Sequence, residues 1–345
     1  MTVTATPTVE RVLGRQAPPT PVSPPVTVSA VGDLCFMGGG HNPLGDPATL
    51  LAAVSPHLAA RDLTFGNLET AVSDRGKPED KTFTFRAPTS AAASLASTGF
   101  DVVSLANNHS GDYGGDAFRD TLTAVSAAGL VGVGGGVNRE EAWSPRIVEA
   151  GGRGAPPVRI AFLAFNEILP ENFAATESRP GNTYTQDLQA ILGTVAAARP
   201  LADYLIVSMH WGIERQFEPT ERQVREAHAL IDAGVDVVLG HHPHVIEGIE
   251  FYGGGLIAYS LGNFVFSPGS AQGRDTYVLD FTLSPGGISD VAAYPAYISG
   301  ASPVFVSGAE FGRIGGLIAQ YSRQRGAAVE IAADSVSLRP AAGAP

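Results

Sequence analysis

The sequence predicts a layered α/β fold, because strand-like and helix-like segments alternate over most of its 345 residues. In addition, six of the strand-like segments run directly into short polar clusters. The ends of neighbouring strands meet at one edge of a sheet, and sites in α/β proteins usually form there. We therefore expect the polar clusters to converge on one site. They lie at residues 33, 67–69, 107–112, 210–214, 241–244 and 260–263.

The first half of the chain is expected to contain strands separated by helices. Alternating or short apolar runs predict the strands, at 26–36, 63–70, 101–114 and 130–136. Apolar residues that recur about every 3.6 positions predict the helices, at 47–60, 87–99 and 117–129. The glycines at 132 and 134–136 lack the spacing of a dinucleotide-binding motif, so we expect a flexible loop there.

The second half repeats this alternation. Strands are expected at 158–167, 203–212, 235–245 and 276–283, and helices at 185–198 and 220–234, where Gly234 suits a helix C-cap. Three glycines at 253–255 separate two apolar segments and predict a β-hairpin. The pattern weakens after residue 283. The expected organisation is therefore a flexible arm at 1–25, one domain at 26–283 and an extension of unknown role at 284–345, with a loose tail.

Composition narrows the classes of function. The chain carries 34 Asp and Glu against 22 Lys and Arg, a net charge of −12, so it lacks the basic surface of a general nucleic-acid or anionic-membrane binder. A single cysteine, Cys35, excludes an intramolecular disulfide. The sequence shows neither an apolar run of the roughly 18 residues that a membrane span needs nor a secretory signal, which together predict a cytoplasmic protein.

The first polar clusters combine carboxylates with an amide and a thiol. Asp33 ends a strand, and Cys35 follows at strand spacing; its thiol is a candidate metal ligand, although a buried filler is the commoner role of a free cysteine. Asn67 and Glu69 show the same spacing and offer a neutral oxygen and a carboxylate to a metal or a proton. A turn at Asp33 and a solvated Glu69 are the structural alternatives.

The third cluster, ANNHSGDYG, contains groups suited to acid–base chemistry. Asn108 is a candidate neutral metal ligand, and His109 is a candidate proton donor to a leaving group. Asp112 would orient His109 or hold the loop. The preference of Asn for turns explains one member of this cluster but not the whole group.

Histidines mark the later clusters. Five of the eight histidines in the chain fall in polar clusters, and the sequence GHHPHV places His242 and His244 on either side of a proline. Two imidazoles at this spacing, near His210, suit a divalent metal such as Zn²⁺ or Mn²⁺. Glu214 follows as a candidate supporting group. Taken alone, His210 could equally be a hydrogen-bonded core histidine.

Six stretches, in this order along the chain, resemble the CapA family of bacterial capsule synthesis proteins, also called poly-gamma-glutamate capsule biosynthesis proteins. They are VGDLCF, FGNLET, ANNHSGDYG, MHWGIE, GHHPHVIEGIE and YSLGNFVF, within residues 26–283. The family is similar to calcineurin-like metallophosphoesterases. The resemblance therefore implies a four-layer α/β/β/α sandwich of two mixed sheets and a site for one or two divalent ions, Mn²⁺, Zn²⁺ or Fe²⁺.

Carried over position by position, the resemblance implies a set of site residues. The implied metal ligands are Asp33, Asn67, Glu69, Asn108, His210, His242 and His244, and the implied catalytic groups are His109, Asp112 and Glu214. The chain departs from the metallophosphoesterase pattern at two positions. Cys35 replaces a histidine, and Asn67 replaces a carboxylate that normally bridges two metals, which favours one ion over two.

Three functions stay open from the sequence. The first is a metal-dependent hydrolase-like centre that acts on polyglutamate, another extracellular polymer, or a small amide or phosphate ester. The second is a non-catalytic module that binds a polymer or a partner and assists synthesis or transport. The third is a true metallophosphoesterase. The sequence does not set the substrate or the oligomeric state.

Overall fold

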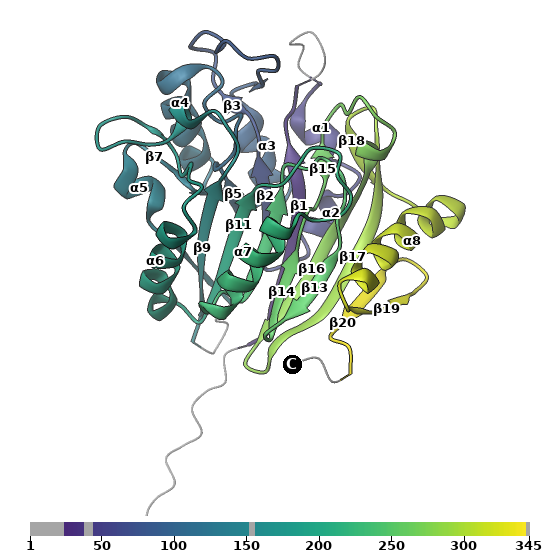
Figure 1. Cartoon of the computed structure of the whole chain (residues 1–345). Helices are drawn as coiled ribbons and strands as arrows, with labels where there is room; N and C mark the ends of the chain where they lie inside the picture. Colours follow the sequence, from purple (N-terminus) through teal and green to yellow (C-terminus); the bar gives the residue numbers. More distant parts are fainter. Residues whose placement is uncertain (1–23, 38–43, 152–155, 343–345) are drawn as a thin grey trace, which may run out of the picture.

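Two β-sheets form the centre of the computed structural model, which describes residues 24–37, 44–151 and 156–342 (Figure 1). The larger sheet has the order β19 (Ala328–Ile331), β20 (Val336–Arg339), β17 (Gly287–Ser299), β16 (Asp275–Ser284), β1 (Val26–Leu34), β2 (Leu63–Leu68), β5 (Val102–Ser104) and β6 (Val131–Val133). Two more strands join it, β15 (Asn263–Val265) beside β1 and β18 (Ser302–Phe305) beside β17. The arm expected at 1–25 lies almost wholly outside the described residues.

The smaller sheet has the order β13 (Ile249–Tyr252), β14 (Gly255–Ala258), β12 (Val237–His241), β11 (Tyr204–His210), β9 (Val158–Asn166) and β8 (Arg146–Ala150). Both sheets are mixed. Parallel pairing joins β1, β2, β5 and β6 in the larger sheet and β9, β11, β12 and β14 in the smaller one, and antiparallel strands flank each parallel group. The strands of each parallel group therefore all end at the same edge of their sheet, and this edge is called the rim below.

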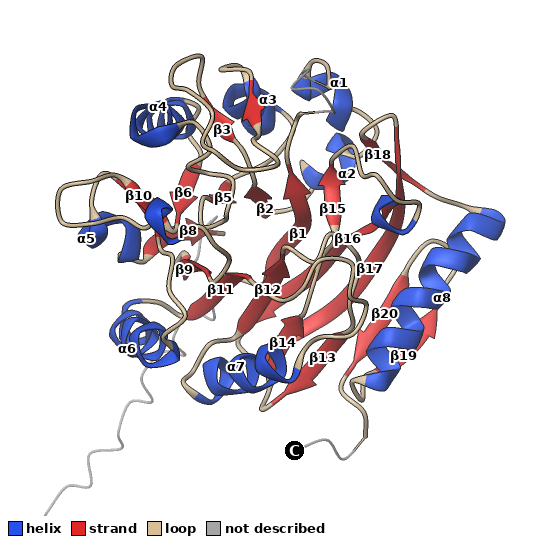
Figure 2. Ribbon diagram, turned by 45° about the horizontal axis from the view of Figure 1, so that its top comes forward, coloured by secondary structure: helices blue, strands red, loops and turns tan. Residues whose placement is uncertain are grey.

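Side chains alternate between two apolar layers along the central strands. In β9, Ile160 and Phe162 pack between the two sheets, whereas Leu163 and Phe165 pack on the opposite face. Figure 2 shows helices on both outer faces of the sheet pair. These helices are α3 (Ala91–Ser97) and α4 (Gly114–Ala127) over the larger sheet, and α6 (Leu188–Ala198) and α7 (Glu221–Asp232) over the smaller one. This arrangement confirms the expected α/β/β/α sandwich of two mixed sheets.

Several predicted elements take a different form. The helix expected at 47–60 is two short helices, α1 (Pro47–Leu51) and α2 (Ser55–Leu58). The flexible glycine loop is a wrong prediction at two places: Gly132 lies in β6, and residues 135–136 form β7 (Gly135–Gly136), which is buried and pairs with β10 (Gly181–Asn182). A Cβ on Gly136 would lie 2.4 Å from the backbone nitrogen of Ala142, so close packing explains the glycine there.

The expected hairpin is present, since β13 and β14 pair antiparallel around its glycines. Its second arm, β14, ends at Ala258, and the chain then crosses to the larger sheet and forms β15 beside β1. The helix expected at 220–234 is α7, and Gly234 follows it with a φ of 97°, as a C-terminal glycine does.

Residues after 283 continue the larger sheet. They form β17, β18, β19 and β20, and α8 (Gly308–Gln324) packs on β17 and β19. Strand β8 was likewise not expected. Within the described ranges, no helix combines the length and apolar character that crossing a bilayer requires.

Glu247 supplies a first prediction. Its side chain is buried, Gln223 Nε2 donates to its Oε2 at 3.1 Å, and burial raises its pKa from 4.5 to about 8. Between these two pH values the folded state holds a proton that the unfolded state releases, so stability falls as pH rises. We expect Glu247→Gln to remove this decline, which is about 1.4 kcal/mol per pH unit. Chemical unfolding of both proteins at pH 5, 7 and 9 measures it; parallel stability curves would contradict the assignment.

Candidate metal centre

The predicted polar clusters meet at a rim to which both sheets contribute. In the larger sheet, Asp33 on β1 pairs in register with Asn67 on β2 and with Asn263 on β15. In the smaller sheet, His210 on β11 pairs with His241 on β12. The parallel strands place these residues at their carboxyl ends, which is where sites in open α/β sheets form.

The surroundings of Glu69, just beyond β2, are unusual for a carboxylate. Its side chain is fully buried, and neither carboxylate oxygen has a hydrogen-bond partner among the described residues. Its Oε1 lies 3.5 Å from His210 Nε2 and 3.9 Å from His244 Nε2. Burial and repulsion from Asp33 raise the pKa of Glu69 well above its usual range. A buried carboxylate without donors is costly, so this site suits a cation.

The neighbouring donor atoms are spaced as ligands of one ion would be. The ligand atoms of Glu69, His242 and His244 all lie within 4.8 Å of one another. His210 Nε2 lies 2.9 Å from Asn108 Oδ1, and the rings of His210 and His242 have centroids 5.0 Å apart. Metal–ligand bonds of about 2.0–2.2 Å place adjacent ligand atoms roughly 3–3.5 Å apart. The Glu69–His244 pair, at 3.9 Å, is slightly wider than this, and the imidazole, amide and carboxylate donors are of the types that a divalent cation takes.

The protonation of His244 can be deduced from its neighbour Asn263. The Asn263 amide nitrogen donates to the carbonyls of His244 and Gly273, so its Oδ1 is an acceptor. That oxygen lies 2.9 Å from His244 Nδ1, which must carry the hydrogen. Asp33 Oδ2 is 3.1 Å from the same nitrogen. His244 therefore has Nε2, on the Glu69 side, as its ligand atom, and Asp33 and Asn263 hold the ring, as second-layer groups do in metal sites.

The backbone around Pro243 is unusual. His242 and His244 have φ values of 94° and 58°, a left-handed conformation that non-glycine residues rarely adopt. The Arg215 N–H donates to the Pro243 carbonyl at 2.8 Å and helps to hold this turn. Such conformations concentrate at functional sites because the surrounding structure must stabilise them.

Asn67 does not present its oxygen to the histidines. The His109 backbone N–H donates to Asn107 Oδ1, so the Asn107 amide nitrogen is the donor to Asn67 Oδ1 at 3.1 Å. The Asn67 amide nitrogen then donates to Asp33 Oδ1 at 2.9 Å and lies 3.3 Å from His210 Nδ1. In this arrangement Asn67 orients Asp33, and Glu69 supplies the carboxylate.

His109 and Asp112 form a buried pair beside the donors. His109 Nδ1 lies 2.6 Å from Asp112 Oδ2, which also accepts the Phe85 backbone N–H. The Phe85 ring stacks on His109 with a centroid distance of 3.8 Å. Burial lowers the pKa of His109, although its hydrogen bond with Asp112 opposes this. The pairing leaves Nε2 as the ring nitrogen available to a substrate.

Two predicted candidates lie outside the donor group. The Cys35 thiol is buried and contacts the Met37 carbonyl at 3.6 Å, which favours its role as a filler. Glu214 is exposed, makes no hydrogen bond to the donor group within the described ranges, and influences His244 only through its charge. His241 is fully buried, with Nδ1 3.4 Å from Asp33 Oδ1.

The sequence patterns did not indicate Lys81 and gave Asn263 no role. Asn263 lies in the last polar cluster, so its position after a strand was an available signal. Lys81 lies in the charged stretch DRGKPEDK, which resembles a solvated loop. Its ammonium nevertheless bonds Asp112 at 2.8 Å, a contact over 31 residues that no local pattern indicates.

Cation binding at this centre is expected to release a proton. Although burial opposes it, the charges of Glu69 and Asp33 raise the pKa of His244 to about 9. Below that pH a cation must displace the proton from His244, so affinity should rise about tenfold per pH unit between pH 6 and 8. Calorimetric titration of Mn²⁺ in buffers with different ionisation enthalpies measures the released proton. Affinity independent of pH would contradict this.

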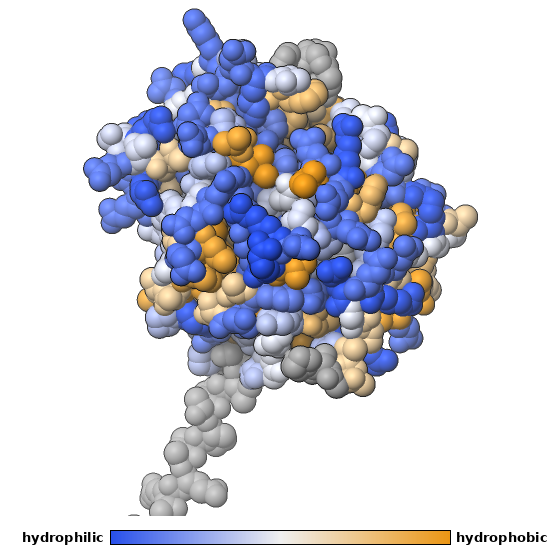
Figure 3. Space-filling view, viewed as in Figure 1, coloured by the Kyte–Doolittle hydropathy of each residue, from blue (hydrophilic) through white to orange (hydrophobic). Residues whose placement is uncertain are grey.

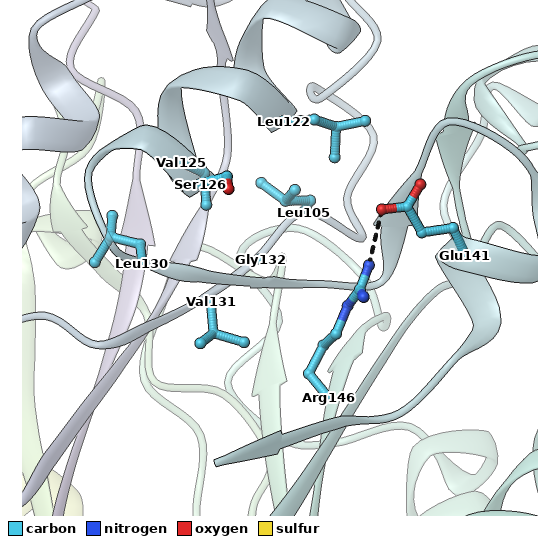
Figure 4. Close-up of a pocket in the computed structure, with 9 residues that line it drawn as sticks. All are labelled: Leu105, Leu122, Val125, Ser126, Leu130, Val131, Gly132, Glu141 and Arg146. Atoms are coloured by element: carbon cyan, nitrogen blue, oxygen red, sulfur yellow. Dashed lines mark hydrogen bonds and ion pairs between the residues drawn. The ribbon is translucent and has the colours of Figure 1, made fainter.

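Another cavity lies away from these donor residues. It has a volume of about 220 Å³ and is lined by Leu105, Leu122, Val125, Ser126, Leu130, Val131, Gly132, Glu141 and Arg146 (Figure 4). Its lining combines apolar side chains with Glu141 and Arg146, which form an ion pair at 3.1 Å. Within the described ranges, no predicted site residue lines it, so this cavity is not the centre described above.

Comparison with known proteins identifies relatives. Residues 27–268 match the family model of the bacterial capsule synthesis protein PGA_cap. The chain is 33% identical to the capsule biosynthesis protein CapA of Bacillus anthracis over 82% of its own length and 70% of that protein. It is 35% identical to the PGA biosynthesis protein CapA of Bacillus subtilis, over 72% of the chain and 65% of that protein. The chain thus spans about two thirds of these relatives.

Among solved structures, the NAD nucleotidase of Haemophilus influenzae aligns over 86% of this chain and 62% of that one, with 12% identity and a TM-score of 0.48. The resemblance to CapA found in the sequence motifs is confirmed by the family match and by the two Bacillus proteins. The chain belongs to the PGA_cap family of bacterial capsule synthesis proteins.

Proposed function

We propose that this protein assists capsule or polyglutamate synthesis and that its rim centre is a hydrolase site for one divalent cation, Mn²⁺, Zn²⁺ or Fe²⁺. The names of its Bacillus relatives support the biosynthetic role. One observation carries the metal site: the Glu69 carboxylate is buried, has no hydrogen-bond donor among the residues that the structure describes, and faces His210 and His244. Such a cation, when bound, supplies Lewis-acid activation of a phosphoryl or acyl oxygen.

The chain's own residues have separable roles in this proposal. The cation would be held by Glu69, Asn108, His210, His242 and His244. Asp33 and Asn263 would fix the His244 ring. His109, oriented by Asp112, would exchange a proton with the leaving group through Nε2.

A neighbouring pocket offers room for the body of a substrate. It has a volume of about 290 Å³ and is lined in part by Gly212 and Ile213, which lie two and three residues after His210. Glu167 also lines this pocket, and its backbone N–H donates to the His210 carbonyl at 3.0 Å. The face seen in Figure 3 is mostly hydrophilic, with small separate hydrophobic patches. Ile213 is 54% exposed, so it can contact the apolar part of a substrate.

The test is metal analysis combined with turnover. We expect purified protein, reconstituted with Mn²⁺, to retain one ion per chain and to hydrolyse an aryl phosphodiester or a γ-glutamyl anilide. His242→Ala should lose both properties. The control is His228→Ala, because that ring stacks on Tyr252 and bonds Glu250 away from the centre. Protein that retains no metal and hydrolyses neither substrate would overturn the proposal in favour of a binding module.

A further inference from the structure

The segment from Glu79 to Phe85 lies across the loop that carries His109. It follows β3 (Ala71–Val72) and precedes β4 (Arg86–Ala87). The Glu79 backbone N–H donates to the Asp112 carbonyl at 2.8 Å, and the Phe85 N–H donates to Asp112 Oδ2 at 2.6 Å. Phe85 also stacks on His109. The two loops are therefore joined at their backbones and through an aromatic contact.

Lys81 provides the charged contact between these loops. Its ammonium donates to Asp112 Oδ1 at 2.8 Å and to the Asn108 carbonyl at 2.7 Å, and it lies 3.3 Å from His109 Nδ1. Its side chain is only 20% exposed, and that of Asp112 is fully buried. Hydrogen bonds between charged groups are stronger than neutral ones, and a buried pair is costly to break from one side.

These contacts determine what His109 can do. With Lys81 on Oδ1, and with Phe85 N–H and His109 on Oδ2, the Asp112 carboxylate is held in one orientation. An ammonium has donors only, so it keeps Asp112 an acceptor. His109 Nδ1 must then be the protonated nitrogen of that contact, and Nε2 is left to exchange protons. The bond to the Asn108 carbonyl also fixes the backbone next to this candidate ligand.

We propose that Lys81 is a positioning residue that fixes His109, through Asp112 and the Asn108 backbone, to protonate basic leaving groups. This rests on the hydrolase function proposed above. In hydrolysis, the water oxygen bonds to phosphorus or acyl carbon, the bond to the leaving oxygen or nitrogen breaks, and a water proton ends on that leaving atom. His109 carries this proton. The preferred substrates are therefore alkyl esters or amides, whose leaving groups need protonation, rather than activated aryl esters.

The test uses Lys81→Met, with Lys81→Arg as the variant that keeps the charge. The control is Lys77→Met, because Lys77 is an exposed lysine just before this segment. In full-length metal-free protein labelled with ¹⁵N-histidine, the His109 signals are identified by their absence in His109→Gln. We expect the Nδ1–H tautomer in the wild type, Lys77→Met and Lys81→Arg, and a tautomer mixture in Lys81→Met. Thermal unfolding checks that each variant is folded.

Turnover provides the second readout. Lys81→Met should lower hydrolysis of an alkyl phosphodiester by about 10²-fold and that of its p-nitrophenyl counterpart by less than about 10-fold, with unchanged Mn²⁺ content. An unchanged His109 tautomer in folded Lys81→Met, or equal losses for the two substrates, would overturn the role of Lys81. If the wild type hydrolyses neither substrate, the hydrolase function fails, while the tautomer measurement still decides whether Lys81 positions His109.

Discussion

Replacing Glu69 with glutamine is expected to abolish stoichiometric cation binding and to stabilise the metal-free protein. The glutamine removes the only carboxylate in the group of mutually close ligand atoms that includes His242 and His244, so affinity should fall at least about 100-fold. It also removes a buried carboxyl group that lacks a donor among the described residues and whose raised pKa makes folding less favourable as pH rises. We expect the metal-free variant to gain about 1–3 kcal/mol in free energy of unfolding.

Chemical unfolding with EDTA and with Mn²⁺ measures both effects. The wild type should be stabilised by Mn²⁺, and the variant should not. Glu247→Gln is the matched control, since Glu247 is also a buried carboxyl group with a raised pKa but bonds Gln223 instead of facing the histidines. A Glu69→Gln protein that retains its ion, or that is less stable than the wild type in EDTA, would show that Glu69 is a structural residue.

Replacing His109 with glutamine is expected to lower turnover by about 10²–10⁴-fold without loss of metal. The imidazole contacts Asp112 and Phe85 and is separate from the Glu69, His242 and His244 group. Glutamine can still donate to Asp112, so the loop should keep its shape. Only the group that exchanges the proton is lost.

Steady-state kinetics and metal analysis of the same preparation separate the two roles. His228→Gln is the matched control, because it changes a histidine on α7 whose partners are Glu250 and Tyr252. If His109→Gln loses its ion together with its activity, the residue supports the metal site rather than the chemistry. If it keeps full activity on alkyl and aryl substrates alike, proton exchange must occur elsewhere.

The central strands could be predicted from sequence because their signal is local. Val158–Asn166 is apolar on both faces, as a strand covered by two layers must be, and ends in a polar residue. The same logic placed Asp33, Asn67 and His210 at one rim. A strand pattern followed by polar residues can be recognised locally, and parallel strands that end at one edge then predict a shared site without knowledge of long-range contacts.

The rest depended on contacts that sequence spacing does not encode. Strand β17 includes Asp290 and Pro295 and alternates only partly between buried and exposed positions, so its pairing with β16 gave no clear pattern. Lys81 is charged and lies outside any strand end. The role of Asn67 rests on which way its amide points, and that is set by Asn107 and the His109 backbone.

Each of the two sheets contributes residues to the proposed cation site. One supplies Glu69 and the other His210, although 141 positions separate them in the chain. An ion bound by both residues would cross-link the two sheets. A shift of one sheet relative to the other would then break metal–ligand bonds. Neither half of the polypeptide carries all of the proposed ligands. A fragment of either half would therefore lack the complete cation site.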